Sequence, residues 1–383
     1  MPQSGGRPLT VMFSAGEASG DRHAAALFQE LRKYAPQARG IGMGGAEMRR
    51  AGVELSFDSS GIGVIGLFEI IKHYPEIRKA LNLQKDLLRR EKPDLLICVD
   101  YKEFNLKLAR HAKSLGVKVL FYVGPQVWAW RPGRVKTYGK AVDMMAVIFP
   151  FEPPYYEAHG VPVRYVGHPA LDKVSPARGK AENLIHFGLN PAQPIVGIFP
   201  GSRGQEIKRM LPVMLQAAQR FAARHPGAQF ILPQAGSVAD ALLHPHLAAC
   251  PLQIKVVKQQ MIDVALCCDA IMTTSGTATL EIALIGAPMA ICYRLSALSY
   301  WLGKQLVNIP YIGLPNIIAG KPVVKEFIQH ALTAENLAAE MEALVFEPAR
   351  RAECIAELAQ VKQRLGSGGG SKNMAQLALE MLN

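Results

Sequence analysis

The feature that most constrains the fold is an alternation of short, continuously apolar segments with longer amphipathic segments. Continuously apolar runs are typical of parallel strands, which helices bury on both faces. The alternation therefore predicts parallel α/β layers. We expect strands at 9–14, 94–99, 117–123, 142–149, 195–199, 229–232, 253–257, 269–272 and 288–292, and helices that include 21–34, 103–115, 205–224, 277–285 and 372–382.

One pattern of apolar strand, glycine-containing turn and helix occurs near the start of the chain and again near its middle. A chain of 383 residues is too long for one compact core. We predict two Rossmann-like domains, 1–167 and 168–383, that face each other across a cleft. The glycine-rich segment 366–371 precedes a last helix. The sequence leaves open whether that helix crosses to the first domain or to a partner subunit, and it does not predict an oligomeric state.

Charge and composition narrow the classes of partner. The formal net charge is +12 and is spread along the chain, which favours anionic partners such as phosphorylated substrates or an anionic membrane surface. The basic segments lack the interleaved aromatic residues of single-strand binders, so no nucleic-acid partner is expected. No apolar run is long enough to span a membrane, and the N-terminal segment has no secretory pattern. The six cysteines form no C-x-x-C pair and are expected to be reduced thiols of a cytosolic protein.

The segment FPGSRGQ at 199–205 lies between an expected strand and an expected helix. Gly201 allows the backbone to approach a ligand, and the amides that follow, beginning with Ser202, have no partners within the helix. Amides at a helix start attract anions, and Arg203 can bind two oxygens at once. We predict that this turn holds a diphosphate. The alternative is a plain strand–helix turn with an exposed arginine.

TTSGTATLE at 273–281 repeats that arrangement. Ser275, Gly276 and Thr277 open a helix, and their amides and hydroxyls suit a phosphate. Glu281 lies one turn further on, where its carboxylate can accept hydrogen bonds from two ribose hydroxyls. Two anion-binding turns in one domain favour a nucleoside diphosphate. The alternative is a capped helix with an exposed glutamate.

Two carboxylates follow expected strands of the first domain. Asp100, in CVDYKEFN, stands at the carboxyl end of an apolar strand, where partial burial would raise its pKa toward use as a general base. Glu17, in AGEASGD, would repel a phosphate and better suits a ligand rich in hydroxyls. We take both as candidate catalytic residues. Helix capping is the alternative for each.

Two further segments, 66–81 and 123–136, combine apolar with basic residues, and the second also contains two tryptophans, as membrane-interface segments do. A core helix and a buried tryptophan loop are the alternative. The candidate membrane and acyl contacts are Leu67, Phe68, Ile70, Ile71, Trp128, Trp130 and Arg131.

Two other kinds of site are not expected from the sequence. A G-x-G-x-x-G at 61–66 does not follow an apolar strand and is rejected as a dinucleotide site. No D-x-D and no zinc-like spacing occur, so neither a metal nor a cofactor is expected.

Together these segments resemble the lipid-A-disaccharide synthase family, which are inverting glycosyltransferases of the two-Rossmann-domain (GT-B) type. The resemblance extends over nearly the whole chain. One departure concerns the family pattern D-x-P-D-F-N, which here reads Asp100-Tyr-Lys-Glu103-Phe-Asn105 and leaves the role of Glu103 open. The segments that carry the resemblance are AGEASGD, KPDLLICVDYKEFN, YVGPQVWAWRPGRV, FPFE, VGHP, FPGSRGQEI, TSGTATLE, YR at 293–294, LPNIIAG and VVKEFIQ.

The resemblance implies a reaction and its partners. The donor would be UDP-2,3-diacylglucosamine and the acceptor 2,3-diacylglucosamine 1-phosphate, at the cytoplasmic face of a bacterial inner membrane. The products would be a β-1,6-linked disaccharide 1-phosphate and UDP, formed with inversion and without a metal. Asn316, in LPNIIAG, is a further candidate for substrate contact. Two alternatives stay open: another UDP-sugar enzyme of this fold, either an epimerase or a transferase to a soluble acceptor, and a nucleotide-binding module without catalysis.

Overall fold

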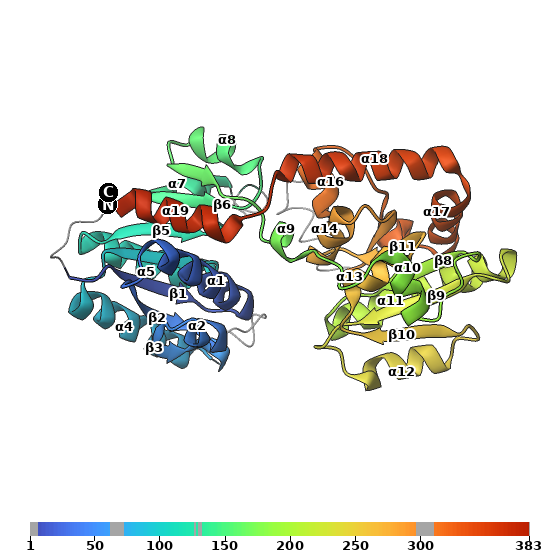
Figure 1. The fold of residues 1–383 in the computed structure, drawn as a ribbon, viewed down its shortest axis with the longest axis horizontal. Helices are drawn as coiled ribbons and strands as arrows, with labels where there is room; N and C mark the ends of the chain where they lie inside the picture. The colour runs from blue at the N-terminus through green and yellow to red at the C-terminus, as the bar shows by residue number, and fades with distance from the viewer. Residues whose placement is uncertain (1–6, 62–72, 126–127, 129–131, 296–309, 383) are drawn as a thin grey trace. The chain divides into compact units, whose positions relative to one another are not determined.

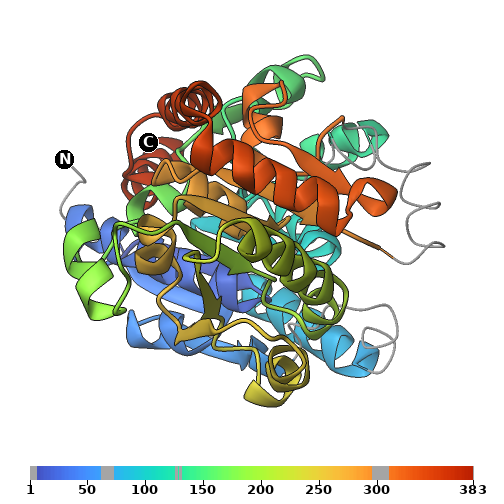
Figure 2. The same cartoon turned by 90° about the vertical axis from the view of Figure 1, so that its right-hand side faces the viewer.

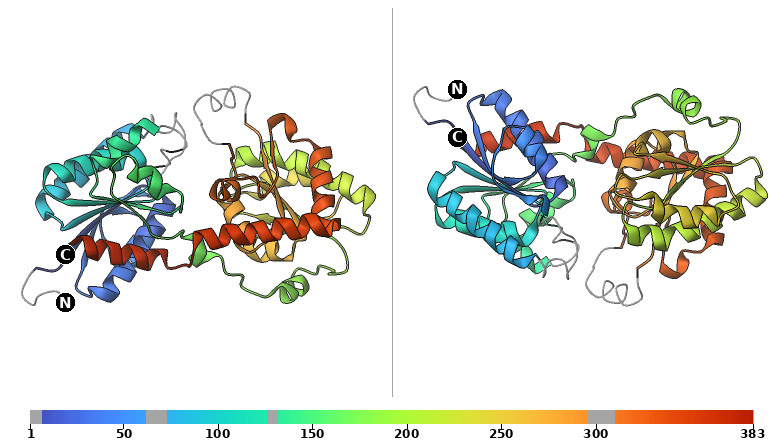
Figure 3. Two further views of the ribbon diagram at one scale, coloured as in Figure 1. Left: turned by 90° about the horizontal axis from the view of Figure 1, so that it is seen from above. Right: turned by 90° about the horizontal axis from the view of Figure 1, so that it is seen from below.

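The computed structural model describes residues 7–61, 73–125, 128, 132–295 and 310–382. It divides into two compact units, Met1–Pro169 with Ser367–Asn383, and Ala170–Gly366. Each unit contains one parallel sheet with helices on both faces, as Figures 1 and 3 show. The predicted fold class of two parallel-sheet α/β domains is therefore confirmed.

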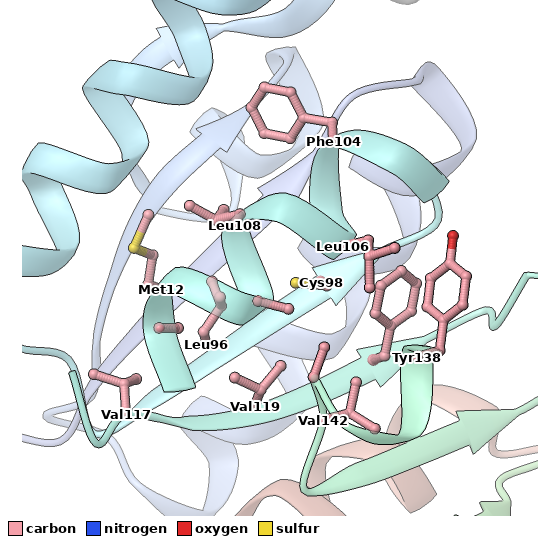
Figure 4. Packing of buried hydrophobic residues seen from close by; sticks show 14 of the residues in the cluster. Met12, Leu96, Cys98, Phe104, Leu106, Leu108, Val117, Val119, Tyr138 and Val142 are labelled. Carbon is pink, nitrogen blue, oxygen red and sulfur yellow. The ribbon is translucent and has the colours of Figure 1, made fainter. Parts of the chain in front are cut away.

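Unit 1 has a seven-stranded sheet in the order β3-β2-β1-β4-β5-β6-β7. Side chains of successive strand residues point to opposite faces, so β1 contributes Met12 to one core and Val11 and Phe13 to the other. Figure 4 shows the first core, between the sheet and α5. The elements of this unit are β1 (Thr10–Ala15), α1 (Ala18–Tyr34), β2 (Arg39–Gly44), α2 (Ala46–Arg50), β3 (Glu54–Asp58), α4 (Tyr74–Glu91), β4 (Leu95–Val99), α5 (Lys102–Ser114), β5 (Lys118–Tyr122), α7 (Val135–Gly139), β6 (Met144–Val147), α8 (Glu152–Glu157), β7 (Val163–Tyr165) and α19 (Gly370–Leu382).

The last helix belongs to unit 1. Its buried residues, among them Met374 and Leu377, pack into the same core as α1. The side-chain amide of Asn373 donates to the carbonyl of Val166 at 3.0 Å. Apolar burial and this hydrogen bond hold α19 against a domain from which it is distant in sequence.

Unit 2 has a six-stranded sheet in the order β10-β9-β8-β11-β12-β13. Helices α11, α12 and α17 pack on one side of it, and α13 and α14 on the other, with α18 against α14; Figure 2 gives a second view of this unit. Its elements are α9 (Ala170–Lys173), α10 (Lys180–His186), β8 (Ile195–Phe199), α11 (Gly204–Arg224), β9 (Gln229–Gln234), α12 (Asp240–Ala248), β10 (Ile254–Lys258), α13 (Met261–Cys267), β11 (Ala270–Thr274), α14 (Thr277–Leu284), β12 (Met289–Tyr293), α16 (Leu314–Ala319), β13 (Glu326–Ile328), α17 (Ala334–Phe346) and α18 (Pro348–Leu365).

Every expected strand is present, with bounds that differ by a few residues, but four strands were not predicted. β2 has the sequence RGIGMG, whose glycines hide the apolar pattern. At Gly42, where φ is +137°, an added Cβ would lie 2.0 Å from the carbonyl oxygen of Phe13, so only glycine fits. β3 is largely exposed, while β7 and β13 have three residues each at sheet edges, too few for a recognisable pattern.

A buried carboxylate connects α1 to the turn after β2. Asp21 accepts hydrogen bonds from the amides of Gly45, Glu47 and Met48 at 2.7, 3.0 and 3.1 Å. These amides open helix α2, where donors have no partners within the helix. The aspartate of the AGEASGD segment is thus fully occupied in holding the fold.

We predict that Asp21→Ala lowers the free energy of unfolding by about 3 kcal/mol, because it leaves three buried or half-buried amides without an acceptor. Chemical denaturation followed by circular dichroism measures the change. Asp86→Ala is the control, since Asp86 is an exposed residue of α4 paired with Arg89 of the same helix, and it should change stability by less than about 0.5 kcal/mol. Equal stability of the two variants would contradict the structural role of Asp21.

Candidate functional site

In both units the polar turns lie where the strand order reverses. β1 pairs with β4 in unit 1, and β8 pairs with β11 in unit 2, each between the two halves of its sheet. The carboxyl ends of adjacent parallel strands at such a point form the usual ligand crevice of open α/β sheets. The turns after β1 and β4 contain Glu17 and Asp100, and the turns after β8 and β11 contain Gly201 and Ser275. All four are candidate site residues predicted from the sequence.

Glu17 and Asp100 come to the same edge of the unit 1 sheet. The last register pair of β1 and β4 is Ala15 with Val99, so the two turns start side by side. The ring of Tyr101 lies over Gly16, where an added Cβ would be 2.3 Å from the ring. Only glycine allows the two turns to approach this closely.

Asp100 has an unusual backbone conformation. Its φ is +48° and that of the next residue, Tyr101, is +46°. Each left-handed residue other than glycine costs on the order of 1–2 kcal/mol, and such residues cluster at functional sites. Burial raises the pKa of the Asp100 carboxyl, opposed by the charge of Lys102 and the amide of Tyr101. A half-buried carboxylate with a raised pKa is suited to accept a proton.

Glu17 precedes helix α1 as its N-cap residue, but its side chain makes no capping hydrogen bond. Burial raises the pKa of the Tyr101 phenol, and the negative charge of Glu17 adds to that effect. The Glu17 carboxylate is therefore near Tyr101, on the same edge of the sheet as Asp100.

Glu103, the residue at which the sequence departs from the family pattern, is exposed and bound to Arg134. Both carboxylate oxygens accept from the guanidinium, one of them at 2.9 Å, and this hydrogen bonding raises the pKa of Arg134. The guanidinium also lies 5.5 Å from the ring centre of Tyr138. Glu103 thus fixes the segment that follows the tryptophan loop to the start of α5.

Trp128 is half-buried, and its indole nitrogen donates to Glu152 at 3.1 Å. Its ring meets that of Phe151 edge-on at 4.9 Å. Glu152 also accepts from the amide of Phe149, and burial raises its pKa to about 7. The hydrogen bond to Glu152 and the ring contact with Phe151 thus hold the Trp128 side chain in place. The other predicted membrane contacts lie outside the described residues: Leu67, Phe68, Ile70, Ile71, Trp130 and Arg131.

The turn after β8 already holds an anion from its own chain. The amides of Ser202 and Arg203 donate to Oε2 of Glu206 at 3.0 and 3.2 Å, and Nη1 of Arg203 lies 3.3 Å from Oε1. Gly201 has φ +103°, and an added Cβ would lie 2.4 Å from that carboxylate. Arg203 stays 66% exposed, whereas Glu206 is 15% exposed. The usual capping-box pattern has Ser or Thr at the first position, so Arg203 concealed this arrangement in the sequence.

The turn after β11 is more open. The Ser275 hydroxyl donates to the carbonyl of Ile312 at 2.9 Å, which anchors the turn. Gly276 and Thr277 are exposed, and a Cβ added at Gly276 would meet nothing within 4 Å. Within the described part of the chain, their amides donate to no acceptor. Unpartnered amides at the start of α14 can receive phosphate oxygens.

Glu281 is half-buried one turn further along α14. Burial raises the pKa of its carboxyl, while the positive charge of Lys173 lowers it. It remains a candidate acceptor for ligand hydroxyls beside the Ser275 turn.

Asn316, predicted from the sequence as a substrate contact, makes its hydrogen bonds within unit 2. Its side chain is fully buried. The amide nitrogen donates to the carbonyl of Val324 and to Glu326, both at 2.8 Å, and the amide oxygen accepts from the amides of Val323 and Val324. Because every polar atom is used, Asn316 supports the segment that anchors Ser275.

Across the described ranges, no group of three or more His, Cys, Asp or Glu side chains is placed to hold a metal ion. Across the same ranges, no helix is both long enough and apolar enough to cross a bilayer.

Comparison with known proteins agrees with these features. The family model described as lipid-A-disaccharide synthetase matches residues 11–381. A lipid-A-disaccharide synthase of Geobacter metallireducens is 50% identical over 372 residues, which cover 97% of each chain.

Solved structures with low sequence identity share the fold. A glycotransferase of kitacinnamycin has a TM-score of 0.66 at 14% identity and covers 99% of this chain and 100% of its own. A UDP-GlcNAc 2-epimerase from Neisseria meningitidis, bound to UDP-GlcNAc, has a TM-score of 0.59 at 11% identity, with 97% and 98% covered. The predicted GT-B fold and glycosyltransferase class are confirmed. The chain belongs to the lipid-A-disaccharide synthase family.

Proposed function

We propose that the chain transfers 2,3-diacylglucosamine from its UDP derivative to 2,3-diacylglucosamine 1-phosphate, forming a β-1,6-linked disaccharide 1-phosphate and UDP with inversion. Membership of the family supports this reaction. The observation that carries it is Asp100, a half-buried carboxylate in a strained conformation at the switch point of the unit 1 sheet.

In this mechanism the 6-hydroxyl of the acceptor attacks the anomeric carbon of the donor. The carboxylate of Asp100 takes the hydroxyl proton as the new C–O bond forms, and the bond from the anomeric carbon to the diphosphate breaks. General-base assistance of this kind is typically worth ~10²–10⁴-fold in rate. Glu17, on the same sheet edge, is assigned to the sugar hydroxyls, where a carboxylate accepts hydrogen bonds without repelling a phosphate.

The leaving UDP develops negative charge, and unit 2 offers groups that stabilise it without a metal. We assign the diphosphate to the exposed Arg203 guanidinium and to the unpartnered amides of Gly276 and Thr277. In the first turn, Gly201 leaves room for the Glu206 carboxylate and the Ser202 amide donates to it, which supports the turn beneath Arg203. Ser275 holds the second turn in place. Glu281 is assigned to the ribose hydroxyls.

Both substrates carry acyl chains, so we propose that the protein works on the cytoplasmic face of the inner membrane as a peripheral protein. The net charge of +12 favours an anionic surface. Helix α4 continues the predicted apolar–basic segment and bears an open hollow where Tyr74 and Leu83, 54% and 39% exposed, lie with Arg78 and Lys79. Exposed apolar and basic side chains together are typical of membrane-interface helices.

We predict that purified protein in mild detergent releases UDP and forms a disaccharide only when both acylated sugars are present. EDTA should leave the rate unchanged, because the Arg203 guanidinium and the amides of Gly276 and Thr277 take the place of a metal in this scheme. Product analysis by thin-layer chromatography and mass spectrometry measures this. UDP release without a disaccharide would mean hydrolysis or another acceptor. Inhibition by EDTA that Mg²⁺ reverses would contradict the metal-free scheme.

We predict that Asp100→Asn lowers kcat by roughly 10²–10⁴-fold, since it removes the base, while UDP affinity measured by calorimetry stays the same. Because the base acts when deprotonated and burial raises its pKa, kcat/KM should fall with decreasing pH at a value above the ordinary aspartate pKa of about 3.9. Glu353→Gln is the control on an exposed carboxylate, which is paired with Arg350 on the same helix of unit 2. A variant at position 100 that keeps near-wild-type turnover would place the base elsewhere.

We predict that Arg203→Ala lowers kcat/KM by ~10²–10³-fold, the usual effect of removing one stabilising donor of developing charge. The matched control is Arg224→Ala, which removes an exposed, glutamate-paired arginine from the far end of the same helix. The control should keep wild-type kinetics. Unchanged kinetics of Arg203→Ala would remove the diphosphate from this turn.

A further inference from the structure

Asn105, which the mechanism above does not use, lies beneath the Asp100 turn. It is the fourth residue of helix α5 and is completely buried. Its amide nitrogen lies within hydrogen-bond distance of three main-chain carbonyl oxygens, those of Asp100 at 2.8 Å, Ser14 at 3.1 Å and Val99 at 3.3 Å. One side chain thus connects the carboxyl ends of β1 and β4.

The other end of the same amide is also held. The hydroxyl of Ser14 donates to Oδ1 of Asn105 at 2.6 Å, and Ser14 is itself completely buried. This hydrogen bond fixes which way the amide is turned, because the oxygen must accept from the hydroxyl and the nitrogen must face the carbonyls. Ser14 and Asn105 therefore form a satisfied polar pair inside an apolar core.

Asn105 completes the fixation of the Asp100 backbone. The Asp100 amide donates to the carbonyl of Tyr122 on β5 at 3.0 Å, while the Asp100 carbonyl accepts from Asn105. With both peptide groups bound to neighbouring elements, the residue stays in the left-handed region at φ +48°. Such conformations persist only where the surroundings determine them strongly. Removing the Asn105 donor frees the turn to relax into an ordinary conformation.

We propose that Asn105 is a positioning residue for Asp100, with Ser14 fixing its orientation. The proposal rests on the assignment of Asp100 as the general base. A base must lie within hydrogen-bond reach of the proton that it removes, and a displacement of about 1 Å can cost on the order of 10²-fold in rate. The amide acts through the direction of the Asp100 backbone and does not touch a substrate.

The test compares Asn105→Ala with wild type in steady-state kinetics on both acylated sugars. We expect kcat to fall by about 10²-fold, with the KM for the UDP-sugar and the calorimetric UDP affinity unchanged, because the nucleotide groups are in unit 2. Asn183→Ala is the matched control: it removes a completely buried amide that bonds the carbonyl of Arg178 and the carboxylate of Asp263 within unit 2. It should lower thermal stability without lowering kcat.

A double-mutant cycle separates positioning from a purely structural role. If Asn105 acts through Asp100, adding Asn105→Ala to Asp100→Asn should lower the residual rate by less than about twofold, because residues that act as one unit are not additive. A second full loss of about 10²-fold in that background would overturn the proposal. So would wild-type kcat in a folded Asn105→Ala protein.

Ser14→Ala keeps the test decisive if Asn105→Ala fails to fold. It leaves the amide in place but removes the hydrogen bond that orients it, and we expect kcat to fall about fivefold, the worth of one hydrogen bond. Unchanged kcat in this variant would also overturn the proposal. If Asp100→Asn itself keeps full turnover, the assigned base is wrong; if it abolishes turnover while the Asn105 and Ser14 variants do not lower kcat, only the positioning role fails.

Discussion

The pairing of two central strands in each sheet is the constraint on which the candidate site depends. β1 with β4, and β8 with β11, are hydrogen-bonded parallel neighbours at the point where the strand order reverses. Parallel strands end at the same edge, and helices leave that edge in opposite directions, so a polar crevice opens there. The register Ala15 with Val99 then decides that the Glu17 and Asp100 turns begin side by side. Without this pairing the motifs would be unrelated turns.

The polar groups around these turns serve two different purposes. Asp21, Asn316 and Glu206 bind main-chain amides of their own domain, because a buried or crowded turn must satisfy its donors internally. The Arg203 guanidinium and the amides of Gly276 and Thr277 are instead exposed to solvent. Exposed donors beside turns whose other donors are satisfied suit the proposed diphosphate site, since the turns keep their conformation whether or not a ligand is bound.

Most of the strands, and the positions of the candidate residues along the chain, could be predicted from the sequence. The strands and contacts that could not be predicted have physical reasons. Apolar runs such as Ile195–Phe199 are long and buried on both faces, so their pattern is plain. Glycine-rich β2 and the three-residue edge strands have no such pattern. The position of Asp100 at the sheet edge could be predicted because this residue directly follows an apolar strand. The burial of Asn316 could not be predicted, because a polar residue in a distinctive segment looks the same in sequence whether it faces a ligand or binds buried amides.

Glu103 lies at the start of α5, next to the constrained Asp100 turn. Its side chain reaches outward to Arg134, which in turn lies over Tyr138, so this carboxylate is used at the surface. The residues that hold Asp100 are separate from this pair: the carbonyl of Tyr122, and Asn105 oriented by Ser14, all lie in the buried layer beneath the turn. A substitution on the exposed side of α5 therefore leaves the conformation of Asp100 intact, because buried groups on the other side of the turn determine that conformation.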